Sequence, residues 1–307
     1  MKPLRHVALP CYLARPSQIR HRLSLWRRGR SATLQPLRLP WGAVIQGRTE
    51  EDLGYGIAAT GVADLVLTEL LWRMVKPGDC VADVGANIGY ASLVCALRAG
   101  SGGSVHAFEP HPALQEELVD NLALWRGDAR MAPIKLVRAA VGAATGRAIL
   151  YEPEAGFAAN RGTSSLRERP NGARYEVEVL TLDGYAELAG SGRVFVKIDV
   201  EGAEAEVLRG AQGLLQSERI QHMAFEEFAP YPAATHQMLE GWGYRILHVE
   251  PHLFGPKLRA TRAGFVPPNY IPANYLATRD AEAAREAFAR GGWQCLRGGE
   301  MRGQAGT

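Results

Sequence analysis

The chain has 307 residues, of which 47% are hydrophobic and 22% charged, so it has the composition of an ordinary globular protein that can bury a full core. No apolar run reaches about 18 residues, and no membrane span is expected. The formal net charge is +3, but ten basic and no acidic residues precede Glu50, which leaves −7 for the remainder of the chain.

Residues 1–38 form a basic N-terminal extension, in which a helix is predicted to begin at Pro16 with Ile19, Leu23 and Trp26 on one stripe. Arginines flank this stripe, so the helix could contact an anionic membrane surface or an acidic partner. An Arg-rich segment without acidic residues is also typical of a transit peptide. We favour a solvated basic arm, because charge runs are usually solvated.

Residues 34–60 alternate between apolar and polar side chains and predict a β-hairpin or two short strands. An apolar helix is predicted over Asp64–Val75, and Lys76-Pro77-Gly78 ends it. We assign the main domain to residues 39–285, with its core at 78–280. The glycine-rich residues 286–307 are expected to be a flexible tail.

Val81–Tyr90 follows that stop and has the pattern of a strand, a glycine turn and a helix. Such a turn leaves the N-terminus of a helix facing a ligand, and glycine lets the backbone approach it closely. The dinucleotide fingerprint requires three glycines, but two of the three positions hold Asn87 and Tyr90. The turn is therefore not a typical dinucleotide site.

Glu109 ends the next predicted strand, twenty positions after Gly89, where a carboxylate can accept hydrogen bonds from ribose hydroxyls. Asp83 places a second carboxylate at the end of the first strand. Two acids suit a ligand with a ribose and a positive charge better than a pyrophosphate. S-adenosylmethionine, a sulfonium with a ribose and an amino acid end, has these features.

Strands and helices continue to alternate along the chain, which predicts an α/β fold with a mostly parallel, doubly wound sheet. Two extra strands flank a long polar loop at residues 152–174, and loops of that length are usually functional or mobile. The last two strands could form an antiparallel pair. The predicted elements are strands at 81–85, 105–109, 134–138, 148–151, 175–180, 194–199, 221–226, 244–249 and 274–278, and helices at 88–98, 112–125, 181–188, 203–214 and 235–241.

Four blocks of residues occur in a distinctive order. They are Lys76-Pro77-Gly78-Asp79 leading into Asp83–Tyr90, then Phe108-Glu109-Pro110, then Thr181-Leu182-Asp183, and then Lys197–Glu204 followed by Val207–Ala211. In this order the blocks resemble the FkbM family of class I S-adenosylmethionine-dependent methyltransferases, over about residues 60–250. The resemblance implies a Rossmann-like, seven-stranded sheet with S-adenosylmethionine over the carboxyl ends of its first strands.

The resemblance also implies which residues hold the cofactor. The methionine end would lie against Asp83, Gly85, Ala86, Asn87 and Gly89. Glu109 would bind the ribose. Many such enzymes have an acid and a small residue after the third strand to meet the adenine, whereas this chain has Arg138-Ala139-Ala140-Val141. Adenine contacts are therefore expected from backbone and apolar groups, including Ala140.

Methyl transfer requires an aligned nucleophile and can use a base that removes its proton. Asp199 and Glu201, at the end of a central strand, are the first candidates for this base, although Glu201 could instead cap the next helix. Glu226 and Glu227 are the second candidates. The cysteines and histidines show no ligand spacing, so we expect no metal and a reducing, cytoplasmic setting.

The resemblance implies O-methylation of a hydroxyl on a sugar, glycan, lipid or secondary metabolite. N-methylation, methylation of a peptide or protein, and a non-catalytic binding protein of the same fold stay open, and an oxidoreductase that uses NAD is disfavoured by Asn87 and Tyr90. Nucleic acid is not expected as a substrate, because the basic residues cluster in the leader without interleaved aromatics. The sequence gives no indication of the oligomeric state.

Overall fold

The structure is a computed structural model, and it describes residues 16–153, 161–169, 171–190, 192–266 and 274–297. Its centre is an eight-stranded sheet with the order β12-β11-β13-β10-β9-β3-β4-β5. The strands are β3 (Cys80–Val84), β4 (Ser104–Phe108), β5 (Ile134–Val137), β9 (Val194–Ile198), β10 (Ile220–Glu226), β11 (Arg245–Glu250), β12 (Lys257–Ala260) and β13 (Asn274–Thr278).

The middle of this sheet is parallel, as predicted. Strands β10, β9, β3, β4 and β5 pair in parallel, and β3 and β9 are buried along their whole length. The register places Val84 of β3 opposite both Phe108 of β4 and Ile198 of β9. Because these three residues are each at or next to a strand end, the residues that follow them emerge together at the carboxyl edge of the sheet.

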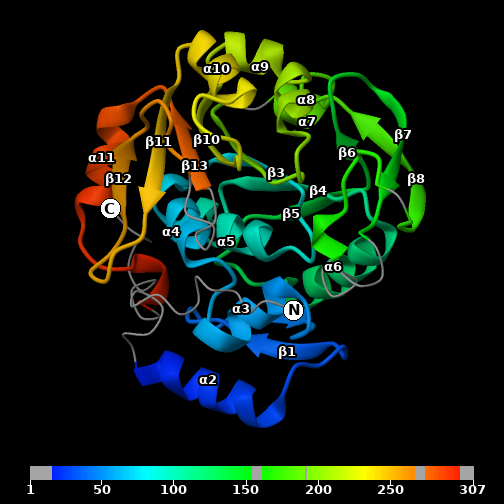
Figure 1. Cartoon of the computed structure of the whole chain (residues 1–307), viewed down its shortest axis with the longest axis vertical. Coiled ribbons are helices and arrows are strands. Elements are labelled where there is room, and N and C mark those ends of the chain that lie inside the picture. The colour runs from blue at the N-terminus through cyan, green and yellow to red at the C-terminus, as the bar shows by residue number, and fades with distance from the viewer. Residues whose placement is uncertain (1–15, 154–160, 170, 191, 267–273, 298–307) are drawn as a thin grey trace.

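Helices cover both faces of the sheet, which gives three layers (Figure 1). One face packs against α4, α5, α6 and α11, and the other against α7, α8, α9 and α10. The bounds are α4 (Leu65–Met74), α5 (Tyr90–Ala99), α6 (Pro112–Trp125), α7 (Ala186–Ala189), α8 (Glu204–Arg209), α9 (Gln212–Gln216), α10 (Ala234–Gly241) and α11 (Ala281–Ala289). The sequence predicted this arrangement except for α11 and the break between α8 and α9.

A second, small sheet has the order β6-β8-β7 and lies beyond β4 and β5 in Figure 1. Its strands are β6 (Ala140–Val141), β7 (Gly146–Tyr151) and β8 (Arg174–Leu180). The two extra strands of the prediction correspond to β7 and β8, which pair antiparallel. A 3₁₀ turn, η3 (Arg161–Thr163), lies within the polar loop that they flank.

The N-terminal part contains the predicted hairpin, formed by β1 (Gln35–Arg38) and β2 (Val44–Gly47). The helix α3 (Asp52–Thr60) replaces the extended chain expected after it. Helix α2 (Pro16–Arg28) packs on α3 at the far end of the molecule (Figure 1). Its predicted stripe of Ile19, Leu23 and Trp26 faces solvent, with Trp26 81% exposed.

Two expectations for the C-terminal part are wrong. The sheet has eight strands rather than seven, because β12 forms within residues 250–271 and pairs antiparallel with β11. Residues 286–297 are no flexible tail, since α11 continues to Ala289 and Trp293 is 2% exposed. The predicted antiparallel pair of last strands is present as β11 and β13.

Among the helices of the described segments, none is by itself long and apolar enough to cross a membrane. Helices α3 and α4 together meet that test of length and composition, but they are bent by 82° where they join.

Candidate active site

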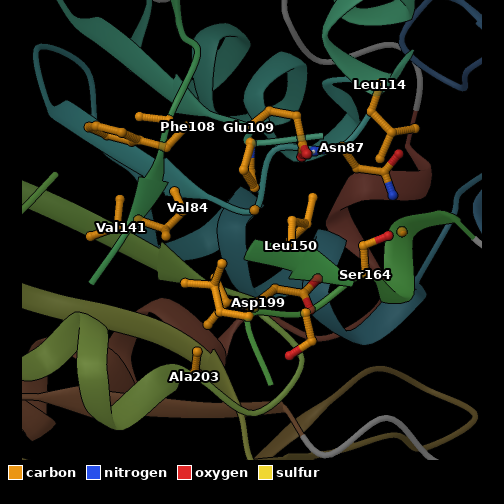
Figure 2. A pocket seen from close by; sticks show the side chains of 18 of the residues that line it. Val84, Asn87, Phe108, Glu109, Leu114, Val141, Leu150, Ser164, Asp199 and Ala203 are labelled. Atoms are coloured by element: carbon orange, nitrogen blue, oxygen red, sulfur yellow. Dashed lines mark hydrogen bonds between the residues drawn. The ribbon is translucent and has the colours of Figure 1, made fainter. Parts of the chain in front are cut away.

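A pocket opens at the carboxyl edge of the central strands (Figure 2). It contains about 620 Å³ of space not filled by protein atoms, including its open side. Figure 2 shows Glu109 and Asn87 in the pocket wall together with Asp199. The register of β3, β4 and β9 explains this meeting, because Gly85, Glu109 and Asp199 directly follow the three aligned residues.

Gly85 is required by the geometry of this edge. Its φ is +81°, and a Cβ at this position would lie 1.9 Å from the carbonyl oxygen of Asp199. Its N–H and that of Ala86 both donate to the carbonyl oxygen of Phe108, at 3.0 Å each. The turn after β3 is therefore fastened between the ends of β4 and β9, and only glycine fits there.

Asn87 occupies the position where a dinucleotide site has its second glycine. Its φ of +54° is a left-handed conformation that asparagine adopts more readily than most residues. Its backbone N–H donates to Glu109 Oε2 at 2.7 Å, and its own Oδ1 accepts from Ile88 N at 2.7 Å. The side chain thus supports the turn, and it also lines the pocket.

Glu109 is 4% exposed, and backbone N–H groups hold both of its oxygens. Asn87 N donates to one oxygen, and His111 N donates to the other at 2.8 Å. Burial raises the pKa of Glu109 to about 7, although these two hydrogen bonds favour the charged form. Each carboxylate oxygen keeps a lone pair for a hydroxyl of a ligand.

Asp83 lies behind the pocket wall rather than in its lining, as do Ala86 and Gly89, which the resemblance also implied as contacts. The carboxylate of Asp83 is fully buried, accepts a hydrogen bond from Ser92 Oγ at 2.6 Å and forms an ion pair with Lys197 Nζ at 3.1 Å. Asp83 therefore supports the turn through the core and does not touch the pocket.

Lys197 connects this buried acid to the pocket. Its ammonium donates to the carbonyl oxygen of Gly85 at 2.7 Å and lies 3.6 Å from Asp199 Oδ2. Burial would lower the pKa of Lys197, but the carboxylates of Asp83 and Asp199 outweigh it and raise that pKa. Lys197 is thus a buried cation that holds β3 and β9 together beneath the site. The sequence analysis quoted it only as part of a motif.

Asp199 and Glu201 both follow β9, and Glu201 lies next to the pocket without being among the residues that line it. The side chain of Asp199 is 34% exposed and lines the pocket. Glu201 is half-buried and has a φ of +55°, a conformation that glutamate rarely adopts. Burial and the nearby charge of Asp199 raise the pKa of Glu201 to about 7. Glu201 does not cap helix α8, because the N-cap position is Ala203 and has no side-chain hydrogen bond.

Glu226, at the end of β10, belongs to the same electrostatic group. Burial raises its pKa well above the ordinary value, and the charges of Asp199 and Asp64 add to this effect. Glu226 and Glu227 are both absent from the pocket lining. Glu227 accepts a hydrogen bond from Ala229 N at 2.9 Å, so its carboxylate supports the turn after β10.

The segment Arg161–Arg169 of the polar loop lies along the pocket, and its residues Arg161, Gly162, Ser164, Ser165 and Leu166 line it. Arg161 forms ion pairs with Glu51 at 2.7 Å and Glu117 at 2.8 Å. At the other end, Ser165 pairs with Tyr151 and donates its hydroxyl to the carbonyl oxygen of Glu201 at 2.9 Å. The segment is therefore anchored on both sides of the pocket.

Two arginines of this segment lie beside Glu201. The guanidinium of Arg167 lies over Gly202, about 3.0 Å from the position that a Cβ would take there. The charge of Arg169 lowers the pKa of Glu201 against the larger effect of burial. The sequence analysis expected this loop to be functional or mobile but missed both arginines, because nothing in the chain order indicates that the loop returns to β9.

The remaining wall of the pocket is apolar. Val84, Phe108 and Leu150 contribute to it, and residues 139–141 continue the wall. This is the surface expected to hold the adenine through backbone and apolar contacts, and Ala140 lies in it. Within the described part of the chain, no group of three or more His, Cys, Asp or Glu side chains is arranged to hold a metal ion.

The methyltransferase FkbM domain family matches residues 83–246, which is more than half of the chain. The protein belongs to this family. Both carboxyl-edge turns, after β3 and after β9, lie inside the matched region. The chain therefore carries an FkbM-family methyltransferase domain with a Rossmann-like α/β fold, and S-adenosylmethionine is the cofactor.

The FkbM-family chain is also 34% identical over 152 residues to the hexuronic acid methyltransferase AglP of Haloferax volcanii. That match covers 48% of this chain and 56% of the relative, so the chain matches little more than half of that protein. Among solved structures, an FkbM methyltransferase from Methylobacillus flagellatus is 17% identical, with a TM-score of 0.40 over 65% of this chain and 43% of the other. An O-methyltransferase from Thermotoga maritima is 16% identical, with a TM-score of 0.35 over 69% and 64%.

The residues of this FkbM-family pocket fit S-adenosylmethionine. Glu109 offers a buried carboxylate with free lone pairs to ribose hydroxyls, and the apolar wall suits the adenine ring. Gly85 and Asn87 expose backbone near the amino acid end, and Asp199 places a negative charge at the mouth of a site that takes a cation. Bound there, the cofactor supplies an activated methyl group on a sulfonium.

Proposed function

We propose that the protein transfers a methyl group from S-adenosylmethionine to a hydroxyl of an acidic sugar. The observation that carries this proposal is that two arginines lie close to the carboxylates that follow β9, beside the pocket. Asp199 and Glu201 lie on the loop after β9, and Arg167 and Arg169 lie on the segment that crosses above it. The hexuronic acid named for the relative AglP supports the same class of acceptor.

The carboxylates serve the chemistry in this proposal. A base works best when its pKa lies near the working pH, and burial brings the pKa of Glu201 to about 7. Glu201 can then accept the hydroxyl proton as the oxygen bonds to the methyl carbon. Asp199, beside Gly85, orients the acceptor, while the buried Lys197 fixes the position of Asp199.

The arginines serve recognition. Arg167 is exposed and Arg169 is half-buried, and guanidinium groups bind carboxylates in a two-pronged geometry. An acceptor with a carboxylate near its reactive hydroxyl would bridge the arginines and Glu201. A small-molecule or glycan acceptor suits this narrow arrangement better than nucleic acid.

The test is transfer of a labelled methyl group to matched acceptors. Oligosaccharides that contain a uronic acid are compared with their neutral counterparts, in which a hydroxymethyl group replaces the carboxylate. RNA and a peptide mixture serve as further acceptors. We expect label on a hydroxyl oxygen of the acidic oligosaccharide, located by mass spectrometry. Label on RNA, on peptide or on nitrogen would refute the proposal.

Arginine variants sharpen this test. Arg167→Gln and Arg169→Gln should raise KM for the acidic acceptor about tenfold or more, the loss expected for a hydrogen bond to a charged group. They should leave the affinity for S-adenosylmethionine unchanged. The matched control is Arg147→Gln, which removes an exposed arginine of β7 that pairs with Glu176. Equal effects in all three variants would contradict a specific role for the two arginines.

A further inference from the structure

A second, larger cavity lies at the opposite edge of the central sheet. Its lining includes Lys76-Pro77-Gly78, directly before β3, and Gly100-Ser101-Gly102, directly before β4. Because β3 and β4 are parallel, these segments mark the amino edge of the sheet, whereas the cofactor pocket lies at the carboxyl edge. The cavity contains about 2160 Å³ of space not filled by protein atoms, including its open mouth. It is therefore separate from the active site.

Cationic side chains dominate this cavity. The lining contains six of them and one acidic side chain, Glu286, and they are Arg73, Lys76, Arg98, Arg130, Arg290 and Arg297. Arg73 is neutralised by Glu69 at 2.6 Å and Arg130 by Asp128 at 2.5 Å. For the other four cations, no carboxylate within the described segments lies at ion-pair distance. Such an excess of one sign in a concave site attracts ligands of opposite charge.

Two of these cations are held where their charge is costly. The Nε of Arg98 is buried and has no hydrogen-bond partner within the residues that the structure describes, and its guanidinium lies 5.3 Å from the Trp72 ring centroid. Among the described residues, Lys76 Nζ donates only to the carbonyl oxygen of Arg73, at 2.8 Å. Burial lowers the pKa of Lys76, and the charge of Arg98 lowers it further. An anion between the two side chains would relieve both effects.

The backbone adds donors at the same place. Across the described chain, the N–H groups of Ser101 and Gly102 have no hydrogen-bond partner. A Cβ built on Gly100 or Gly102 meets nothing within 4 Å, so this turn borders open space. The carbonyl oxygens of Ala96 and Ala99 at the negative end of α5 accept hydrogen bonds from other N–H groups. Consecutive free N–H groups beside cations are typical of phosphate sites.

We infer that this cavity is a binding site for a phosphate or diphosphate group, held by Lys76, Arg98, Arg290 and Arg297 and by the N–H groups of the Gly100–Gly102 turn. Bidentate arginines and a lysine point charge match the several oxygens and charges of such a group. The group could belong to a free phosphate compound or to the headgroup of a lipid at the surface of a membrane. The site lies away from the reaction, so its ligand anchors or regulates the enzyme rather than reacting.

The test uses isothermal titration with inorganic pyrophosphate, on the full chain saturated with S-adenosylhomocysteine so that the cofactor pocket is filled. We expect saturable binding that weakens as salt rises. The variant Lys76→Gln with Arg98→Gln should lose about a hundredfold in affinity, since each contact to a charged group contributes roughly tenfold. The matched control is Arg147→Gln with Arg259→Gln, which changes net charge equally at two exposed arginines elsewhere.

Because Arg98 is largely buried, a second variant guards against misfolding. Arg290→Gln with Arg297→Gln changes only exposed side chains and should give the same direction of loss. Both variants should keep basal methyl transfer, because none of the four residues lines the cofactor pocket. Absence of pyrophosphate binding, or equal loss in the control, would overturn the proposal.

Flotation with vesicles distinguishes the two sources of the phosphate group. Vesicles of phosphatidylcholine with phosphatidic acid are compared with phosphatidylcholine alone. The site is assigned to a lipid headgroup if the protein floats with vesicles that contain phosphatidic acid and the Lys76→Gln, Arg98→Gln variant does not. Pyrophosphate binding without such flotation assigns it to a free phosphate compound. In both cases the failure of this site would leave the proposed sugar methylation untouched, because the two assays have separate readouts.

Discussion

Lys197 offers the sharpest test of how the core supports the site. Its ammonium forms an ion pair with Asp83 at 3.1 Å, donates to Gly85 O at 2.7 Å, and is 4% exposed at the side chain. Replacing it with methionine keeps the length of the side chain and removes the charge. Asp83 would then remain fully buried, and the hydroxyl of Ser92 would be its one side-chain partner within the part of the chain that the structure describes.

The expected cost follows from that burial. Removing one partner of a buried ion pair typically costs about 3–5 kcal/mol, because the other charge stays in a medium that solvates it poorly. Such a loss is a large fraction of the roughly 5–15 kcal/mol by which a domain is stable. We therefore expect Lys197→Met to fold but to unfold at a much lower urea concentration. The turn at Gly85 would lose its anchor as well, so affinity for S-adenosylmethionine should fall.

A double-mutant cycle separates the charge from the packing. Asp83→Asn removes the buried anion, keeps the size of the side chain, and should recover part of the stability when combined with Lys197→Met. Urea unfolding of the wild type, the two single variants and the double variant gives the coupling energy. A cost below about 1 kcal/mol for Lys197→Met, or strict additivity of the two changes, would refute the role of the pair.

Three further predictions concern the pocket itself. Burial raises the pKa of Glu109 to about 7, so the protonated form stabilises the fold at low pH and this contribution is lost as pH rises toward 7, whereas ribose binding needs the carboxylate. The affinity for S-adenosylmethionine, measured by calorimetry, should therefore rise from about pH 6 to about pH 8. The variant Glu109→Gln should flatten that rise. Glu201→Gln should keep cofactor affinity but lower kcat at least about a hundredfold. The increase of kcat with pH near 7 should also disappear. A kcat equal to that of the wild type would refute the assignment of Glu201 as the base. Gly85→Ala should lower the free energy of unfolding in urea by about 3 kcal/mol, because its Cβ meets the Asp199 carbonyl. Gly127→Ala, at a similar φ with nothing within 4 Å, should lower it by only about 1 kcal/mol. Equal losses would show that the contact is unimportant.

Local pattern was enough to predict the central sheet and the cofactor edge. Each parallel strand is a short apolar run that ends at a polar residue, and the order of strands and helices fixes which edge those residues share. Glu109, Gly85 and Asn87 could therefore be placed in one pocket before any coordinates, and all three line it. The antiparallel pair β11 and β13 followed from the same kind of pattern.

The features that sequence reasoning missed depend on contacts between distant residues. Asp83 lies within β3, one residue before its end, and its carboxylate is buried beside Lys197, which lies across from it on β9. Helix α11 is short and rich in alanine, and it is held by packing against α4 rather than by a strong pattern of its own. The return of Arg167 and Arg169 to Glu201 depends on Ser165, a single polar side chain in a long loop.

The backbone at Glu201 connects these observations to function. Four non-glycine residues among those described have a positive φ, and two of them are asparagines, which tolerate it. Glu201 has no such tolerance, yet it holds φ +55° between the hydrogen bond from Ser165 and the left-handed Gly202. Glycine would remove that strain, which is of order 1 kcal/mol or more. The strain is borne by a carboxylate with a pKa near 7, in the loop whose Asp199 lines the pocket, and this supports the assignment of the base to Glu201 rather than to Glu226.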